Sequence, residues 1–198
     1  EAIAAAEDGD TITLNTDYEG AGIFLAEGSK DITIDFGGYT YTVNEAVGSP
    51  GSETQAMHLE KGNTVILKNG TITSNGEGNV KMLVQNYSNL TLGENMVLDG
   101  TSLSGTGRYV LSNNSGTVNI TENASIIAKA GDIALDSCKF GNYDIPNVTI
   151  DTDGKIIGKL EVTGGNLNIQ KGAFTDLANA VKYANDGAII ELADNTTG

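Results

Sequence analysis

Short apolar triads recur along the chain, and a polar turn follows each of them. Their first core positions are 34, 25, 27, 24 and 27 residues apart: Ile23, Met57, Met82, Tyr109, Ile133 and Leu160. A second triad follows in each repeat, as ITI at 32, VIL at 65, LTL at 90, VNI at 118, VTI at 148 and LNI at 167, and a weaker third comes next. Apolar and polar residues alternate within the triads, which predicts β-strands with one buried face.

Three strands in each of six repeats predict a solenoid. One turn of three short strands cannot enclose a core, but stacked turns bury one another's apolar columns. The chain also has 26 glycines, only 2 prolines and no tryptophan, a composition typical of short strands joined by turns. We therefore predict an all-β fold, a parallel β-helix made from a single coiled chain.

The two ends of the chain resemble each other. EAIAAAEDGDTITL at residues 1–14 and NAVKYANDGAIIEL at residues 179–192 are identical at six of fourteen aligned positions. An uncovered end of a β-helix exposes strand edges, so we expect a short capping helix over about residues 1–8 of a domain that spans 1–174. Residues 175–198 are expected to form a helix and strand that begin, or mimic, the next repeat unit.

The helix expected near the C-terminus has clear boundaries in the sequence. Its apolar positions have helical spacing, at Leu177, Ala180, Val181 and Ala184. Thr175 is the expected N-cap, and Gly187 marks the end of the segment. Because two homologous caps can exchange between protomers, a cap-mediated homo-oligomer is one expectation.

Two segments of the sequence resemble a known family. AIAAAEDGDTITL at 2–14, followed by ITIDFGGYTYTV at 32–43, resembles repeat domains of large surface proteins from Gram-positive gut bacteria, which belong to the pectate-lyase-like right-handed β-helix superfamily. The resemblance implies a right-handed coil and an extracellular protein at the bacterial cell surface. It favours a non-catalytic structural stalk or adhesin-like module, with a polysaccharide lyase or glycoside hydrolase of the same superfamily as the alternative.

Enzymes of that superfamily combine clustered aspartates with basic residues. This chain has one histidine, His58, one arginine, Arg108, and no adjacent pair of aspartates. The sequence therefore assigns no catalytic residue, and we expect binding rather than catalysis.

Charge limits the partners. The chain has 26 Asp and Glu against 11 Lys and Arg, a formal net charge of −15. Without a basic run, nucleic acid is not an expected partner, and no stretch approaches the ~20 apolar residues of a membrane span. The single cysteine, Cys138, excludes an intrachain disulfide.

One predicted column is unusual because it is apolar where it should face solvent. Strict alternation places six residues outward on the first strands, namely Phe24, His58, Leu83, Val110, Ala134 and Glu161. Glu60 lies on one side of this column, and Arg108 and Asp132 on the other. An apolar stripe with polar rims is typical of a contact surface, which predicts a site for a glycan or for a host or cell-surface protein. The competing interpretation is that the inserted segment 44–55 covers the stripe.

A single motif bears on metals. Asp151-Thr152-Asp153-Gly154 has the D-x-D-G opening of a calcium loop but lacks the glutamate at its twelfth position, where Val162 stands. We therefore predict no metal site and no cofactor, with Ca²⁺ at Asp151 and Asp153 as the alternative to a simple turn.

Overall fold

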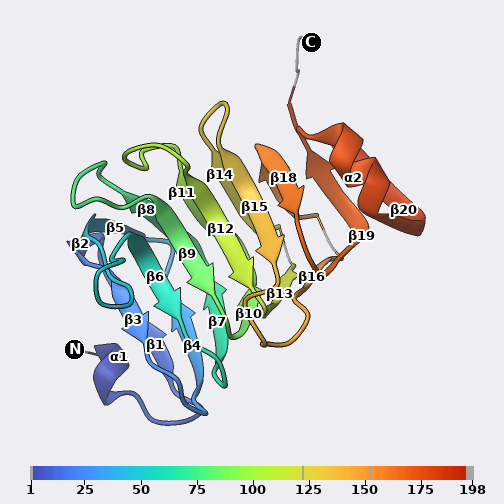
Figure 1. The fold of residues 1–198 in the computed structure, drawn as a ribbon. Coiled ribbons are helices and arrows are strands. Elements are labelled where there is room, and N and C mark those ends of the chain that lie inside the picture. Colours follow the sequence, from blue (N-terminus) through green and yellow to red (C-terminus); the bar gives the residue numbers. More distant parts are fainter. Residues whose placement is uncertain (1, 122, 152, 195–198) are drawn as a thin grey trace.

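The computed structural model in Figure 1 describes residues 2–121, 123–151 and 153–194. Within these residues the chain is nearly all β, with twenty strands and two short helices. All of the strand pairs are parallel, and the sheets curl round an axis. This arrangement is compatible with the expected solenoid. No helix among the described residues is long and apolar enough to cross a membrane.

The first strand of every turn belongs to one sheet of six strands, which we call the first-strand sheet. Its order is β18-β15-β12-β9-β6-β3. The members are β3 (Ile23–Leu25), β6 (Gln55–Leu59), β9 (Met82–Asn86), β12 (Tyr109–Asn114), β15 (Ile133–Cys138) and β18 (Lys159–Val162).

The second and third strands of the turns form a sheet of fourteen strands, which we call the long sheet. The second strands are β1 (Thr11–Thr13), β4 (Asp31–Asp35), β7 (Thr64–Lys68), β10 (Asn89–Leu92), β13 (Thr117–Ile120) and β16 (Asn147–Ile150). The third strands are β2 (Tyr18–Ala21), β5 (Thr40–Glu45), β8 (Gly70–Ser74), β11 (Met96–Gly100), β14 (Ser125–Ala128) and β17 (Lys155–Ile157). The strand β19 (Asn166–Phe174) joins the two series, and β20 (Ala184–Leu192) pairs with it.

Burial in the second strands follows the predicted alternation. In all of them except β1, every second side chain is buried and aligned with its neighbours in the adjacent turns, as in the row Val65, Leu90, Val118 and Val148. None of these four residues is exposed to solvent. The second-strand triads are therefore confirmed as core positions.

The first-strand sheet departs from alternation. Two consecutive residues are fully buried in β9 and in β12, namely Leu83 with Val84 and Val110 with Leu111. Gly100 explains the tight packing in β12, because a Cβ at that glycine would collide with the Val110 side chain. The start of β12 is therefore shaped by its close contact with Gly100 at the end of the preceding third strand.

A ladder of buried amides runs along the inside of the first-strand sheet. Asn86 and Asn113 occupy matching positions in β9 and β12 and are fully buried. Asn86 Nδ2 donates to Asn113 Oδ1 at 2.9 Å, and Asn113 Nδ2 donates to the Gly116 carbonyl at 2.8 Å. Ser137 takes the same position in β15, but its buried hydroxyl has no hydrogen-bond partner in the described part of the chain. The ladder therefore ends there.

Helices lie at both ends of the coil (Figure 1). The helix α1 (Ala2–Ala5) is within the predicted capping segment, and α2 (Leu177–Tyr183) precedes β20. The N-cap of α2 is Asp176, whose side chain accepts from the Asn179 N–H, so the prediction of Thr175 was wrong. The Thr175 hydroxyl instead accepts from the Gly158 N–H at 2.8 Å. The last four residues of the predicted segment 175–198 lie outside the described residues.

Candidate functional site

Five aromatic rings meet on the outer side of the first-strand sheet. We call them the aromatic cluster: Phe24, His58, Tyr87, Phe140 and Tyr143. Their ring centroids are 5.0 to 6.0 Å apart between neighbours. Phe24 is 44% exposed and Phe140 is 49% exposed, so the two outermost rings present faces to solvent.

His58 lies at the centre of the row and is held on every side. Its ring lies between Phe24 and Tyr87, at centroid distances of 5.0 and 5.6 Å. Its Nε2 is 2.8 Å from Glu60 Oε1, and its Nδ1 is 3.4 Å from Gln55 Oε1. Only 3% of the His58 surface is exposed. The imidazole is therefore fixed in place between the neighbouring rings and is not a mobile group.

The hydroxyl of Tyr87 joins the cluster to polar side chains of the sheet. It accepts from Gln85 Nε2 at 3.1 Å and from Asn114 Nδ2 at 3.2 Å. Burial raises the pKa of Tyr87. These two hydrogen bonds hold the ring of Tyr87 in one orientation.

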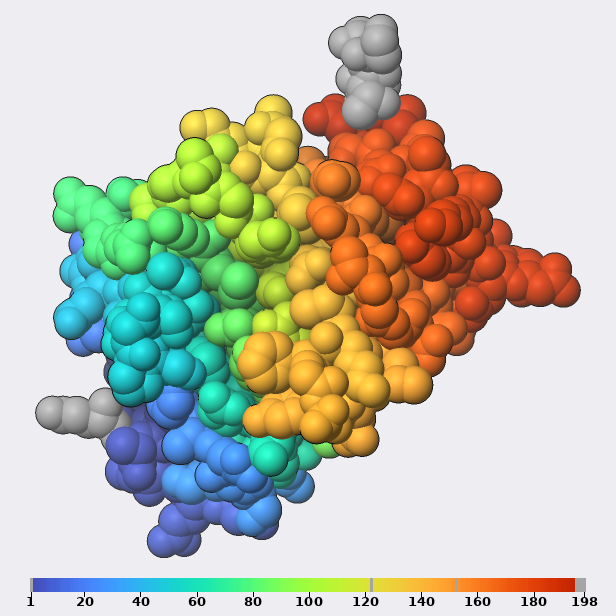
Figure 2. All heavy atoms as spheres, in the orientation of Figure 1, coloured from blue at the N-terminus to red at the C-terminus, as the bar shows by residue number. Residues whose placement is uncertain are grey.

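The segment 139–146 completes the cluster by folding back across the turns. Phe140 and Tyr143 both contact Tyr87 edge-on, two turns earlier in the coil. Lys61 Nζ lies 4.9 Å from the centre of the Tyr143 ring, one turn further back. Figure 2 shows this segment, in orange, lying beside the green and cyan turns on the same face.

Two carboxylates are adjacent on this sheet beyond the cluster. Asp136 and Glu161 are paired in register in β15 and β18. Burial raises the pKa of Asp136, while a hydrogen bond from the Ser112 hydroxyl, at 2.8 Å, opposes the shift and the nearby charge of Glu161 adds to it. A carboxyl with a raised pKa beside a second carboxylate is one arrangement that acid–base enzymes use.

Cys138 follows Asp136 in β15, and its thiol is kept protonated. Its thiol donates to Asn114 Oδ1 at 3.0 Å. Burial, with the charge of Asp136, raises its pKa to about 11. The thiolate needed for nucleophilic chemistry is therefore scarce at neutral pH.

The predicted outward column is wrong in register. Phe24 and His58 are paired as expected, but His58 is followed by Gln85, Ser112, Asp136 and Glu161. Leu83, Val110 and Ala134 are fully buried members of the core. They lie two residues before Gln85, Ser112 and Asp136, and alternation alone does not distinguish registers that differ by two residues. The apolar stripe is therefore covered by the chain, and the exposed surface is aromatic and polar.

Arg108 and Asp132 form a separate pair. Arg108 Nε and Nη2 both lie 2.9 Å from Asp132 Oδ1. These residues precede β12 and β15, whereas Glu60 and Tyr87 follow β6 and β9, so the pair is at the opposite edge of the sheet. The structure therefore brings Phe24, His58 and Glu60 together and leaves Arg108 and Asp132 apart from them.

The two candidate calcium ligands are exposed, and Thr152 between them is outside the described residues. The Asp153 carboxylate is paired with the ammonium of Lys171, which raises the pKa of Lys171. No group of three or more His, Cys, Asp or Glu side chains in the described part of the chain is placed to hold a metal ion.

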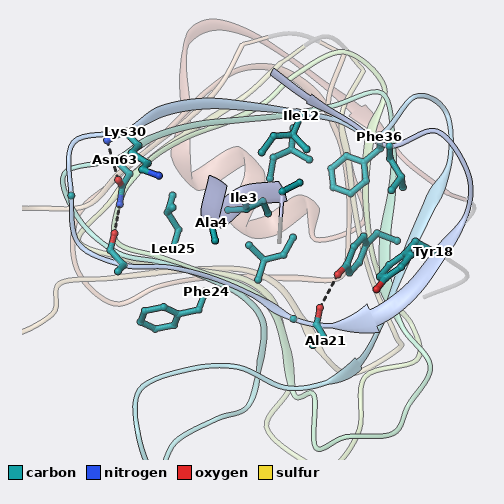
Figure 3. A pocket seen from close by; sticks show the side chains of 18 of the residues that line it. Ile3, Ala4, Ile12, Tyr18, Ala21, Phe24, Leu25, Lys30, Phe36 and Asn63 are labelled. Atoms are coloured by element: carbon teal, nitrogen blue, oxygen red, sulfur yellow. Dashed lines mark hydrogen bonds between the residues drawn. The ribbon is translucent and has the colours of Figure 1, made fainter. Parts of the chain in front are cut away.

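An apolar cavity of about 760 Å³ opens at the N-terminal end of the coil. Its wall includes Ile12, Leu25 and Phe36, and α1 lies in its mouth (Figure 3). Phe24 is among the lining residues of the cavity, although its ring lies on the outer side of β3, away from Leu25 (Figure 3). The hydroxyl of Tyr41 donates to the Ala21 carbonyl at 2.8 Å across the cavity wall.

Sequence reasoning missed Tyr87, Phe140 and Tyr143. They follow strands, and the repeat pattern does not show where a connecting segment folds. The sequence did offer one signal. Aromatic residues make up only 6% of the chain, so each of them was a candidate for a specific role. No protein-family model, curated protein or solved structure matches this chain.

Proposed function

We propose that this chain is a right-handed parallel β-helix of the pectate-lyase-like superfamily that acts as a non-catalytic stalk at a bacterial cell surface and binds a glycan. The observation that carries the binding function is the aromatic cluster, with Phe24 and Phe140 exposed at its ends. The stalk and its location rest on the family resemblance of residues 2–14 and 32–43.

The chemistry of the cluster suits a sugar. Ligand sites combine apolar and aromatic walls with a few placed polar groups, and here the rings lie next to Glu60, Gln85 and Asn114. The hydroxyls of a sugar can bond to such groups while its apolar face packs on an aromatic ring. The net charge of −15 disfavours acidic polysaccharides, so a neutral glycan is the expected ligand.

Pre-organisation supports this function. His58 and Tyr87 are fixed by hydrogen bonds and by stacking before any ligand arrives. A rigid surface loses little conformational entropy when it binds, which is a main cost of association.

A glycan array screened with the purified protein, followed by titration of the best ligand, tests the proposal. Phe24→Ala and Phe140→Ala should each weaken binding about tenfold, as expected when an anchoring side chain worth about 1.4 kcal/mol is lost. Tyr39→Ala is the matched control, because Tyr39 is 39% exposed and lies between β4 and β5 of the long sheet. Equal binding by all three variants would contradict the proposal.

Asp136 and Glu161 favour a second candidate function, a glycoside hydrolase. Such enzymes use one carboxylic acid as a proton donor and a second carboxylate as a base or nucleophile. The raised pKa of Asp136, caused first by burial, fits the proton donor. Release of reducing ends from an array ligand, abolished by Asp136→Asn, would favour the hydrolase over the stalk.

A further inference from the structure

The two copies of the repeated segment bury opposite faces. In the first copy Ile3 packs against the core and Ala2 is exposed. In the second copy the equivalent of Ala2, Ala180, is fully buried, and the equivalent of Ile3, Val181, is 64% exposed. The first helix therefore turns towards the core the face that the second helix turns towards solvent.

The strands that follow these helices differ at one position. Ile12 and its equivalent Ile190 both pack against the core, but Leu14 packs there too, whereas its equivalent Leu192 is 51% exposed. Among the described residues β1 pairs with β4 alone, and β20 pairs with β19 alone. Each copy of the element thus has one covered side and one free side, and the side that is free in the second copy is the side that is covered in the first.

The N-terminal end has room for a larger helix. The four residues of α1 leave a cavity of about 760 Å³ in the end of the coil. The equivalent segment of α2 has Lys182 and Tyr183 where α1 has two alanines, Ala4 and Ala5.

We propose that copies of this chain join head to tail, with α2 and β20 of one copy taking the place of α1 and β1 on the next. Val181 and Leu192 would then occupy the positions of Ile3 and Leu14, and Ile190 would lie opposite the partner's Ile34, as Ile12 does within one chain. β20 pairs with the second half of β19, which continues the row of third strands, whereas β1 begins the row of second strands. The partner is therefore rotated about the common axis, so that its second strands continue the third-strand row of the first copy. This contact is independent of the aromatic cluster and goes beyond the proposed glycan binding.

One charge opposes the contact and provides a sharp test. Thr13 lies beside Asp35 in the pairing of β1 with β4. The equivalent of Thr13 is Glu191, which would place a second carboxylate next to the partner's Asp35. Replacement of Glu191 by threonine removes the repulsion and restores the residue of the first copy.

Sedimentation equilibrium of the whole chain between 1 µM and 1 mM measures the association directly. We expect an average mass that keeps rising with concentration, because head-to-tail contacts do not close. Glu191→Thr should strengthen association about tenfold or more. A single-chain mass at 1 mM for both proteins, or a dimer that does not grow, would overturn the proposal.

Three further variants identify the surface. Val181→Asp should weaken association at least tenfold, while Ile145→Asp, at a matched 63% exposure on the segment 139–146, should leave it unchanged. Ile3→Ala loosens the competing helix and should strengthen association if α2 replaces α1. Weaker association of Ile3→Ala, or equal effects of Val181→Asp and Ile145→Asp, would refute the exchange, and glycan binding by the same proteins reports separately on the aromatic cluster.

Discussion

The two sheets of the coil bury their side chains in different ways. In the second strands of the long sheet every other residue is buried, and rows such as Val65, Leu90 and Val118 contain aliphatic side chains only. In the first-strand sheet consecutive residues are buried, asparagines replace aliphatic residues inside, and an ionisable side chain, His58, is almost fully buried outside.

This difference gives the two sheets different roles. An aliphatic row is stabilised by burial alone and tolerates neighbours of similar shape. A buried amide or imidazole is stable only when each polar atom finds its partner, so it restricts which side chains can stand beside it. The aliphatic rows of the long sheet therefore contribute stability through burial alone, and the first-strand sheet fixes the surface on which the aromatic cluster lies.

The largest effect is expected in the long sheet. Leu90→Ala should lower the free energy of unfolding by about 2 to 5 kcal/mol, because it leaves a cavity between two fully buried neighbours. Urea unfolding measures this loss, and Thr91→Ala on the other face of the same strand is the control. A cost below about 1 kcal/mol would show that the core collapses around the cavity.

A loss of about 1 to 3 kcal/mol is expected for Asn113→Ala, because the variant removes the acceptor of Asn86 and the donor to Gly116. Asn89→Ala, at an exposed position at the start of β10, is the matched control. If both variants unfold at the same urea concentration, the ladder has no role in stability.

A smaller, pH-dependent effect is expected at Asp136. Burial raises its pKa in the folded protein above the ordinary value of 3.8, so the folded state binds the proton more tightly than the unfolded state does. The stability of the native protein should therefore fall relative to Asp136→Asn as pH rises from about 4 through the raised pKa, and the difference should then stay constant. Urea unfolding of both proteins between pH 3 and pH 8 checks this, and a difference that does not change with pH would contradict it.

The smallest effect is expected at the end of the ladder. Ser137→Ala should change the free energy of unfolding by no more than about 0.5 kcal/mol, because the buried hydroxyl has no partner in the described residues. A loss similar to that of Asn113→Ala in the same urea titration would mean that the hydroxyl is bonded in solution.

The sequence allowed prediction of the long sheet, because its triads keep a strict period of two. The same rule placed Met82, Tyr109 and Ile133 in one row with Met57, whereas Met57 is aligned with Val84, Leu111 and Leu135. The error is two residues in each case, because a shift of two residues keeps the same alternation and the rule therefore does not fix the register between turns. The pairing of Phe24 with His58 was predictable from the triads, but Tyr87 and the returning segment 139–146 depend on contacts between turns.

Connections from the third strand of one turn to the first strand of the next differ widely in length. Gly22 alone joins β2 to β3 and Gly158 alone joins β17 to β18, whereas residues 46–54 join β5 to β6. The strands on either side remain paired in every case. A flexible loop that doubles in length costs only about 0.6 kcal/mol. In evolutionary terms, this corner can gain or lose whole segments while the coil beneath it is inherited unchanged.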